Sequence, residues 1–260
     1  MAHSNLAIEI EELSKTYDGQ RYAVNGLQMQ VKWGEIVGLI GPNGSGKSTT
    51  LNILTGLLKP TDGDVIIDDI DLLENPNEAK RLVSYIPDNT DLFPDLTAWE
   101  YAQLVAGLYD RTLSSITAYL ISLFDFFGLT PYRHQLLGTY SHGMLKKAQL
   151  IAGLAHQPKI LILDEPTSGL DTESQVIFKA LLHQLQSHQV AVLLATHQMA
   201  LAEELCDRIC LLKDGQQIAW DETSTLMREH DAKTLEEVFI KLAVDKDSLE
   251  KSINEITKHL

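Results

Sequence analysis

Residues 41 to 49 read Gly-Pro-Asn-Gly-Ser-Gly-Lys-Ser-Thr and match the phosphate-binding pattern G-x-x-x-x-G-K-[ST]. They directly follow the apolar run from Glu35 to Ile40, which is typical of a strand that leads into a helix. Glycines without a Cβ let successive backbone N–H groups turn toward an anion, and the helix N-terminus adds its positive dipole end. The motif therefore predicts a site for a nucleoside triphosphate.

Two side chains of this motif have separate predicted tasks. Lys47 is expected to reach the β- and γ-phosphates, and the Ser48 hydroxyl is expected to ligate Mg²⁺. The alternative is a glycine-rich turn in an unrelated loop, which the preceding strand and the following helix start disfavour. The residues expected to form the cradle are Gly41, Pro42, Asn43, Gly44, Ser45, Gly46, Lys47, Ser48 and Thr49.

A second group of reactive side chains follows the apolar run 160–163, where Asp164 and Glu165 stand in succession. Adjacent residues at the end of a strand point in different directions. Asp164 is placed to hold magnesium through its water shell, and Glu165 to face the terminal phosphate and orient or deprotonate water. The alternative is a solvated Asp-Glu turn with no catalytic role.

A histidine ends the next buried strand, because the apolar run 190–195 is followed by Thr196 and His197. In a parallel sheet the carboxyl ends of the strands lie at one edge, where ligands collect. A lone histidine is usually structural, but at this edge His197 is well placed to touch a γ-phosphate.

The elements that position these groups follow from hydrophobic periodicity. Alternating residues predict antiparallel strands at 6–13 and 27–31, and the continuous runs 160–163 and 190–195 predict a parallel sheet covered on both faces. Helical patterns occupy Thr97 to Tyr109, Leu113 to Phe127, Ser141 to His156, and a stretch from about Thr172. A hairpin is expected to turn at Asp214-Gly215.

The tail beyond Thr223 is expected to be helical, with Asp247 and Glu250 as a capping pair. The apolar residues on one face of this tail helix are Leu249, Ile253, Ile256 and Leu260.

Composition limits the partners of this chain. Its 260 residues carry 36 Asp and Glu against 21 Lys and Arg, a formal charge of -15, so we expect no nucleic-acid partner. No stretch approaches the roughly 18 to 20 apolar residues that cross a bilayer, and the N-terminus lacks a signal-peptide plan. We therefore expect a cytosolic chain, whose two cysteines, Cys206 and Cys210, serve as small buried hydrophobes.

The order of the motifs resembles a known family. The P-loop is followed by Tyr140-Ser-His-Gly-Met144, then by Leu163-Asp-Glu-Pro-Thr-Ser-Gly-Leu-Asp171, then by His197. From about Leu6 to Trp220 the chain is similar to the nucleotide-binding subunit of an ATP-binding cassette (ABC) transporter, of the single-domain bacterial exporter type.

The resemblance implies an α/β fold, a P-loop NTPase with a RecA-like core. It also implies an N-terminal antiparallel β subdomain, which together with the core covers residues 1–88 and 157–222. A helical subdomain would be inserted over 89–156. These parts make up one ABC ATPase domain, 1–222, followed by a helical tail at 223–260.

The resemblance also implies roles for single residues, with ATP and Mg²⁺ as cofactors. Lys47, Glu165 as catalytic base and His197 as γ-phosphate switch would form the catalytic group of an ATPase. Tyr17 would stack on adenine, the alternative being a core tyrosine at a strand end. Ser141 and Gly143 would contact the ATP held by a second subunit, with Asp171 completing the nucleotide-binding set, so that ATP joins two chains and hydrolysis releases them.

Three positions depart from the family pattern. The family signature has a glycine where this chain has His142 and a glutamine where it has Met144. The glutamine expected after Tyr85-Ile-Pro87 is Asp88, which can still ligate magnesium or a water but is one methylene shorter and charged. Because Glu165 is retained, we expect a hydrolytic site.

The partners implied by the resemblance are an integral membrane permease subunit and a second ABC subunit, identical or related. The chain would then be cytoplasmic and peripheral on the inner face of the cell membrane. The helical stretch Thr97 to His156 would form a groove with the core that receives a coupling helix of the permease. The segment from Thr234 to Leu242 resembles the end of cassettes that pair with separate membrane proteins, commonly bacterial exporters.

Two other functions remain open at the level of sequence. A soluble ABC ATPase of translation or DNA repair generally carries two cassettes or a long coiled-coil insertion and favours basic surfaces, unlike this acidic single cassette. A nucleotide-binding regulator without hydrolysis is kept open by Asp88 and His142. The transported molecule and the direction of transport are set by a chain other than this one.

Overall fold

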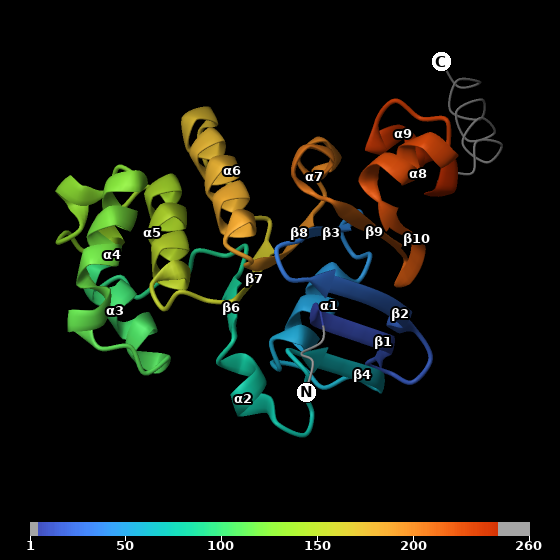
Figure 1. Cartoon of the computed structure of the whole chain (residues 1–260), viewed down its shortest axis with the longest axis horizontal. Coiled ribbons are helices and arrows are strands. Elements are labelled where there is room, and N and C mark those ends of the chain that lie inside the picture. The colour runs from blue at the N-terminus through green and yellow to red at the C-terminus, as the bar shows by residue number, and fades with distance from the viewer. Residues whose placement is uncertain (1–4, 244–260) are drawn as a thin grey trace, which may run out of the picture.

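The computed structural model describes residues 5–243 and contains two β-sheets and a separate group of helices (Figure 1). One sheet has four strands in the order β2-β1-β4-β5, and the other has six in the order β10-β9-β3-β8-β7-β6. The strands are β1 Leu6–Thr16, β2 Tyr22–Lys32, β3 Ile36–Ile40, β4 Asp62–Ile67, β5 Ile70–Asp71, β6 Val83–Ile86, β7 Ile160–Asp164, β8 Ala191–Thr196, β9 Arg208–Lys213 and β10 Gln216–Glu222.

The four-stranded sheet is antiparallel throughout, as the alternating sequence pattern predicts. On β2, Leu27, Met29 and Val31 are fully or almost fully buried, whereas the residues between them are exposed. The predicted strand 6–13 is confirmed but extends three residues further, to Thr16, with irregular register along its pairing with β2.

The six-stranded sheet is parallel except for its edge strand β10, and both of its faces are covered. Alternate residues of β3 belong to different cores: Ile36 and Ile40 pack on one side, Val37 and Leu39 on the other. The prediction of a buried parallel sheet is thus confirmed. The hairpin between β9 and β10 turns at the predicted dipeptide, where Asp214 and Gly215 both have positive φ.

A side-chain amide joins the two sheets. Gln217 on β10 accepts a hydrogen bond from the backbone N–H of Gln28 at 3.1 Å and donates one to the carbonyl of Gln28 at 2.9 Å. The amide therefore copies the two-bond pattern of a neighbouring strand. Next to it, Asn25 N–H donates to the Gly215 carbonyl at 2.8 Å.

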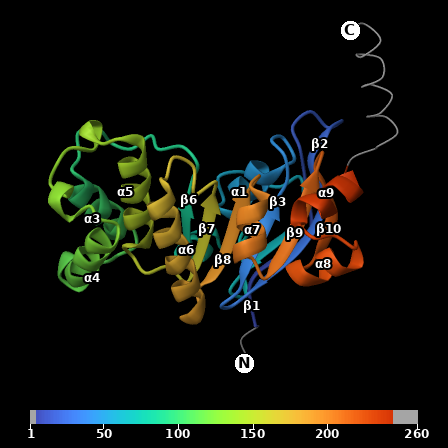
Figure 2. The same ribbon diagram turned by 90° about the horizontal axis from the view of Figure 1, so that it is seen from above.

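Three of the predicted helices pack together beyond the β6 edge of the core sheet, forming a group apart from the strands (Figures 1 and 2). A capping box of Thr97 and Glu100 starts α3, and Ser141 caps α5. Phe124 on α4 is fully buried at their interface and lies against Trp99. These helices are α3 Ala98–Leu108, α4 Leu113–Phe126 and α5 His142–Leu154, with short 3-10 turns at Thr130–Tyr132 and Leu137–Thr139.

The other helices flank the strands. Among the short elements that the sequence patterns do not predict are α2, whose five residues follow Asn75, and β6, whose four residues include the polar Ser84 and Tyr85. The helices are α1 Lys47–Leu54, α2 Pro76–Lys80, α6 Thr172–Ser187, α7 Met199–Leu205, α8 Thr223–Glu229 and α9 Leu235–Ala243.

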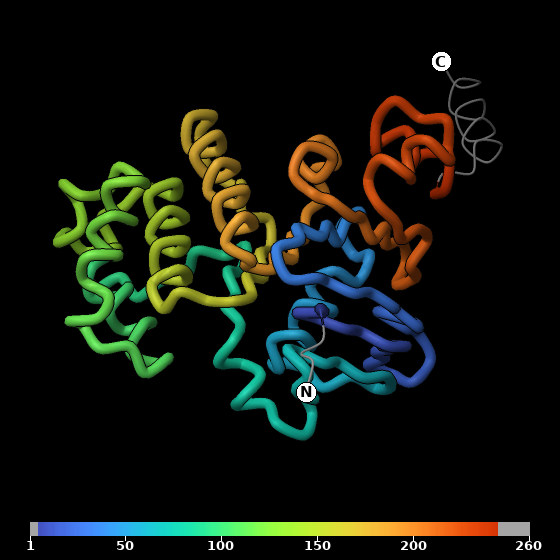
Figure 3. Tube along the Cα trace, viewed as in Figure 1, coloured from blue at the N-terminus to red at the C-terminus, as the bar shows by residue number. Residues whose placement is uncertain are grey.

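The last described helices, α8 and α9, return to the core sheet beside β10 and α7 (Figure 3). Leu235 and Val238 on α9 are fully buried, and the Leu235 N–H donates to the Glu203 carboxylate at 2.8 Å. The helical continuation predicted around Asp247 and Leu249 lies outside the described residues.

The predicted burial of the cysteines is confirmed, since Cys206 and Cys210 are both buried and burial raises the pKa of each thiol. Among residues 5–243, none of the helices combines the length and the apolar content that a membrane crossing requires.

One buried polar side chain lies between the helical group and the core. His156 is 3% exposed, stacks on Tyr109 with ring centroids 3.6 Å apart, and has no hydrogen-bond partner for either ring nitrogen within the described part of the chain. Burial, and secondarily the positive charge of Arg111, lowers the pKa of His156 from 6.5 to about 4. The fold thus requires a neutral imidazole at this position.

We expect His156→Phe, which keeps the stacked ring, to reduce the acid sensitivity of the fold. In the wild type, stability is unaffected by this group above pH 6.5 and falls as the pH drops from 6.5 towards 4, because only the unfolded chain is protonated there. The loss amounts to roughly 2 kcal/mol at pH 5. Urea unfolding at pH 7.5, 6 and 5 measures it, with His183→Gln on the outside of α6 as control. Parallel pH profiles for wild type and variant would refute the assignment.

Candidate nucleotide-binding site

The predicted phosphate loop connects β3 to α1 and is closely packed against the antiparallel sheet. Gly46 precedes α1 with φ 110°, and a Cβ at this position would lie 2.5 Å from the Ala23 carbonyl oxygen. Glycine is therefore required there by both conformation and space. No side chain of the described residues caps α1, so its first backbone N–H groups are left for a ligand.

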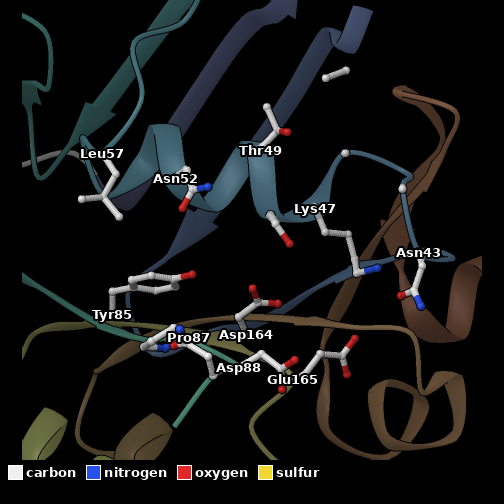
Figure 4. A pocket seen from close by; sticks show the side chains of 15 residues that line it. Asn43, Lys47, Thr49, Asn52, Leu57, Tyr85, Pro87, Asp88, Asp164 and Glu165 are labelled. Carbon is white, nitrogen blue, oxygen red and sulfur yellow. The ribbon is translucent and has the colours of Figure 1, made fainter. Parts of the chain in front are cut away.

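An open cavity of about 770 Å³ lies in front of this loop, a size that suits a nucleotide (Figure 4). It brings together the P-loop, the segment after β6 and the end of β7. The predicted site residues that line it are Asn43, Gly44, Gly46, Lys47, Ser48, Thr49, Asp88, Asp164 and Glu165.

Lys47 lies between the loop and the carboxylates. Its ammonium donates to the carbonyls of Gly41 at 2.7 Å and Pro42 at 3.2 Å. These two residues of the predicted cradle thus contact Lys47 through their backbone and do not line the cavity. Burial lowers the pKa of Lys47, while the charges of Glu165 and Asp164 act in the opposite direction. The lysine is therefore a desolvated cation that faces an acidic wall.

Three carboxylates gather on the side of the cavity opposite the P-loop helix (Figure 4). The side chain of Asp164, at the end of β7, is almost fully buried. Its pKa is raised foremost by burial, then by the charges of Glu165 and Asp88, against the lowering effect of Lys47 and Lys146. A buried carboxylate with two further carboxylates close by favours a cation beside it.

The oxygen ligands of this wall suit magnesium, but they do not surround a metal. Among the residues that the structure describes, no group of three or more His, Cys, Asp or Glu side chains is arranged to hold a metal ion. Ser48 and Asp164 both line the cavity and offer the hard oxygen donors that Mg²⁺ prefers. The remaining ligands of such an ion would have to come from phosphate and water, as is usual for magnesium bound with a nucleotide.

Glu165 is held by the neighbouring strand end. Its carboxylate accepts hydrogen bonds from the Thr196 hydroxyl at 2.8 Å, the His197 N–H at 2.9 Å and the His197 Nδ1 at 2.7 Å. Because a carboxylate only accepts, His197 carries its proton on Nδ1 in this pair. Glu165 also has φ 43°, a left-handed conformation that is unfavourable for a residue with a side chain and marks strain at this position.

Tyr17 lies next to the P-loop helix and is not a core residue. Its side chain is 67% exposed, its hydroxyl lies 3.5 Å from the Thr49 hydroxyl, and the Lys15 ammonium is 5.5 Å from its ring centroid. The alternative of a buried strand-end tyrosine is therefore wrong. The exposed ring beside the P-loop helix is available for stacking.

Of the predicted site residues that do not line the cavity, three stand at the N-terminal ends of α5 and α6. The Ser141 hydroxyl accepts from Met144 N–H at 3.3 Å as the cap of α5, and the Asp171 carboxylate accepts from Ser174 N–H at 2.7 Å as the cap of α6. Gly143 follows in the first turn of α5, where an added Cβ would lie 3.0 Å from the Gly169 carbonyl oxygen. Ser45 belongs to the P-loop, but its hydroxyl is buried within the loop and does not line the cavity.

The structure adds lining residues that sequence reasoning missed: Ala23, Asn52, Leu57, Tyr85 and Asn89. Burial, then the charges of Asp164 and Asp88, raises the pKa of the Tyr85 phenol to about 12. Tyr85 lies three residues before Asp88 in the sequence. This closeness to a predicted site residue was the signal by which Tyr85 could have been found. Thr196 was noted only as a neighbour of His197, and its bond to Glu165 emerged from the structure.

Comparison with known proteins identifies the family. A family model described as ABC transporter matches residues 24–168. The ABC transporter ATP-binding protein NatA of Bacillus subtilis (strain 168) is 32% identical over 219 residues, covering 84% of this chain and 89% of that protein. The Nod factor export ATP-binding protein I of Bradyrhizobium diazoefficiens is 32% identical over 260 residues, covering 100% of this chain and 84% of that protein.

Solved structures agree with this match. A structure of the ATP-binding subunit of an ABC transporter has a TM-score of 0.87 at 29% identity, covering 92% of this chain and 100% of that one. A bacterial ABC transporter cassette solved as a dimer gives 0.77 at 28% identity, covering 83% and 98%. The P-loop, the paired carboxylates and the Glu165–His197 contact thus occur in a chain that belongs to the ABC transporter family, as an ATP-binding and ATP-hydrolysing subunit with the P-loop NTPase fold.

Proposed function

We propose that two cassettes, either two copies of this chain or this chain and a related one, close on ATP and Mg²⁺ and use hydrolysis to drive export through a separate membrane subunit. The observation that carries the hydrolytic part is the Glu165 carboxylate, which is oriented by Thr196 and His197 at the edge of a cavity whose other wall is the P-loop. Asp164 supplies a further negative charge next to Glu165, and Lys47 supplies a positive one.

Each end of the nucleotide has a place in this proposal. Adenine stacks on the exposed ring of Tyr17, and the phosphates lie against the N-terminus of α1 with Lys47 reaching their distal end. Ser48, Asp164 and Asp88 are the side chains that hold Mg²⁺, directly or through water. The ion, when bound, neutralises charge that develops on the phosphate oxygens. Glu165 then orients the attacking water and accepts a proton from it.

The second cassette completes the site. Ser141, Gly143 and Asp171 lie outside the cavity of their own chain, at the N-termini of α5 and α6, where they are free to meet the nucleotide of a partner. The related bacterial cassette has been solved as a dimer and also in a post-hydrolysis state bound to ADP and Pi. Closure on ATP and release after hydrolysis then form a two-state cycle.

The proposed docking face for the membrane subunit is an apolar stripe on α3. On α3, Leu104 is 45% exposed and Leu108 is 74% exposed. Phe93, which precedes the helix and is 59% exposed, lies near Tyr101 of α3. Residues 101, 104 and 108 share one face at helical spacing. Exposed apolar side chains gathered in this way are typical of a surface that another protein covers.

Export and a location at the cytoplasmic face of the membrane are inferred from the relatives. Nod factor export proteins are among them, as is the linearmycin resistance ATP-binding protein LnrL of Bacillus subtilis (strain 168). The Glu165–His197 pair supports hydrolysis over a purely regulatory nucleotide site. The acidic balance of the chain supports a transport role over one on nucleic acid.

Glu165→Gln should lower ATP turnover roughly 10²- to 10⁴-fold while leaving ATP affinity nearly unchanged, because the amide cannot take the proton of water. It should also trap a dimer with ATP and Mg²⁺ on size-exclusion chromatography. Glu173→Gln, at an exposed carboxylate in the first turn of α6, serves as control. A normal rate in Glu165→Gln would remove this carboxylate from the mechanism.

Tyr17→Ala should weaken ATP binding by about 1 to 3 kcal/mol through loss of the stacking surface. Tyr17→Phe should bind ATP almost as the wild type does, because the ring remains. Titration with ATP and, in parallel, with inorganic triphosphate separates the contributions, since only the former has a base. Equal losses for both ligands would contradict a stacking role.

Leu108→Glu combined with Leu104→Glu should abolish co-purification with the membrane subunit from detergent extracts, because two charges would face the buried apolar contact. ATP binding by the free chain should be retained, as neither residue lines the cavity. The matched control is Leu113→Glu with Ile121→Glu, two exposed apolar positions on α4. Recovery of the membrane subunit with the α3 variant would place the docking face elsewhere.

A further inference from the structure

One lysine of the helical group is buried without any role so far. Lys146 on α5 is 0% exposed, although lysines are almost never fully buried. Its ammonium donates to the carbonyl oxygens of Pro87 at 2.9 Å and Asp88 at 3.3 Å. No carboxylate of the described residues lies within ion-pair distance of it, so its direct partners are backbone atoms of the segment after β6.

The same segment is bound to α5 at its next two residues. The side chain of Gln149 donates to the Asn89 carbonyl at 2.8 Å, and His142 Nδ1 lies 3.2 Å from the Thr90 hydroxyl. All four residues from Pro87 to Thr90 are thus held by side chains of one helix. Lys146 makes the central and most buried of these contacts.

The position of Lys146 gives it a second property. Burial lowers the pKa of Lys146, whereas the charges of Asp88, Asp164 and Glu165 act in the opposite direction, although none of these carboxylates forms an ion pair with it. An ammonium that is fixed by two carbonyls is therefore placed behind the acidic wall of the cavity. A neutral side chain would fill the space but would supply neither the bonds nor the charge.

We propose that Lys146 is a positioning residue of the ATP site: by binding the backbone of Pro87 and Asp88, it directs the Asp88 side chain into the cavity beside Asp164. The inference rests on the proposed role of Asp88 at the magnesium and phosphate end of the site. It also explains how the short side chain of Asp88 is held at the wall of the cavity.

The arrangement has a mechanical consequence. Ser141 caps the same helix that carries Lys146, five residues away, and does not line the cavity of its own chain. A displacement of α5 therefore shifts Asp88 at one nucleotide and Ser141 at the other together. Lys146 would link the two sites through rigid contacts within one chain.

The first test is local and requires no turnover. In the full-length chain, Lys146→Met should speed amide hydrogen exchange of peptides covering residues 87–92 by at least about fivefold, because two hydrogen bonds to this backbone are lost. Lys147→Met, at the adjacent and less buried lysine of the same helix, is the control and should leave this exchange unchanged. Unaltered exchange in Lys146→Met would overturn the proposal.

The second test asks whether Lys146 acts through Asp88. Lys146→Met should lower ATP turnover roughly 10- to 100-fold, with ATP affinity in EDTA kept within about threefold of the wild type. In a chain that already carries Asp88→Ala, adding Lys146→Met should lower ATP turnover by less than about twofold further. Losses that multiply would mean that Lys146 acts on another group, which would refute the inference.

A third variant guards against a folding defect. If Lys146→Met unfolds at a lower temperature than the wild type, Lys146→Gln replaces it, because its amide can still donate to a carbonyl. The exchange rate of residues 87–92 in Lys146→Gln should then be faster than in the wild type and in Lys147→Met, and slower than in an unstructured peptide. Exchange equal to that of the control would again overturn the proposal. If the wild type itself shows no turnover, the proposed hydrolysis fails while the exchange measurements still decide the role of Lys146.

Discussion

Concentrated negative charge at the carboxyl edge of the core sheet is the constraint on which this structure depends. Asp164, Glu165 and Asp88 meet there, in a chain that already carries a formal charge of -15, and the ligand they serve is itself a polyanion. The fold offsets this charge from two sides. Lys47 and the N-terminus of α1 lie in front of the carboxylates, and the buried Lys146 lies behind them.

The parallel sheet is what makes such a concentration possible. β8 lies between β3 and β7, so the P-loop, the paired carboxylates and His197 emerge at one sheet edge, although more than a hundred residues separate the P-loop from the other two groups in sequence. The strained backbone at Glu165 is tolerated because both carboxylate oxygens are bound by the end of β8. The sheet edge thus converts distant sequence motifs into one reactive surface.

The sequence alone was sufficient wherever a signal is local and repeated. The continuous apolar strands and the alternating strands β1 and β2 were recognisable because burial on two faces or on one face leaves a distinct pattern in the sequence. The P-loop was recognisable because its glycines, lysine and serine stand at a fixed spacing. Short elements such as α2 and β6 carry too few residues for a period. Lys146 could not have been foreseen, because a lysine in an amphipathic helix normally indicates solvent, and only the packing of α5 against residues 87–90 reverses that expectation.

The amide bridge from Gln217 to the backbone of Gln28 bears on how the molecule tolerates its surroundings. Both groups are uncharged, so neither acidity within the physiological range nor added electrolyte changes their attraction, whereas ion pairs on the surface weaken as salt rises. This contact between the antiparallel sheet and the core sheet is therefore kept under conditions in which the charges around the nucleotide vary with every round of hydrolysis.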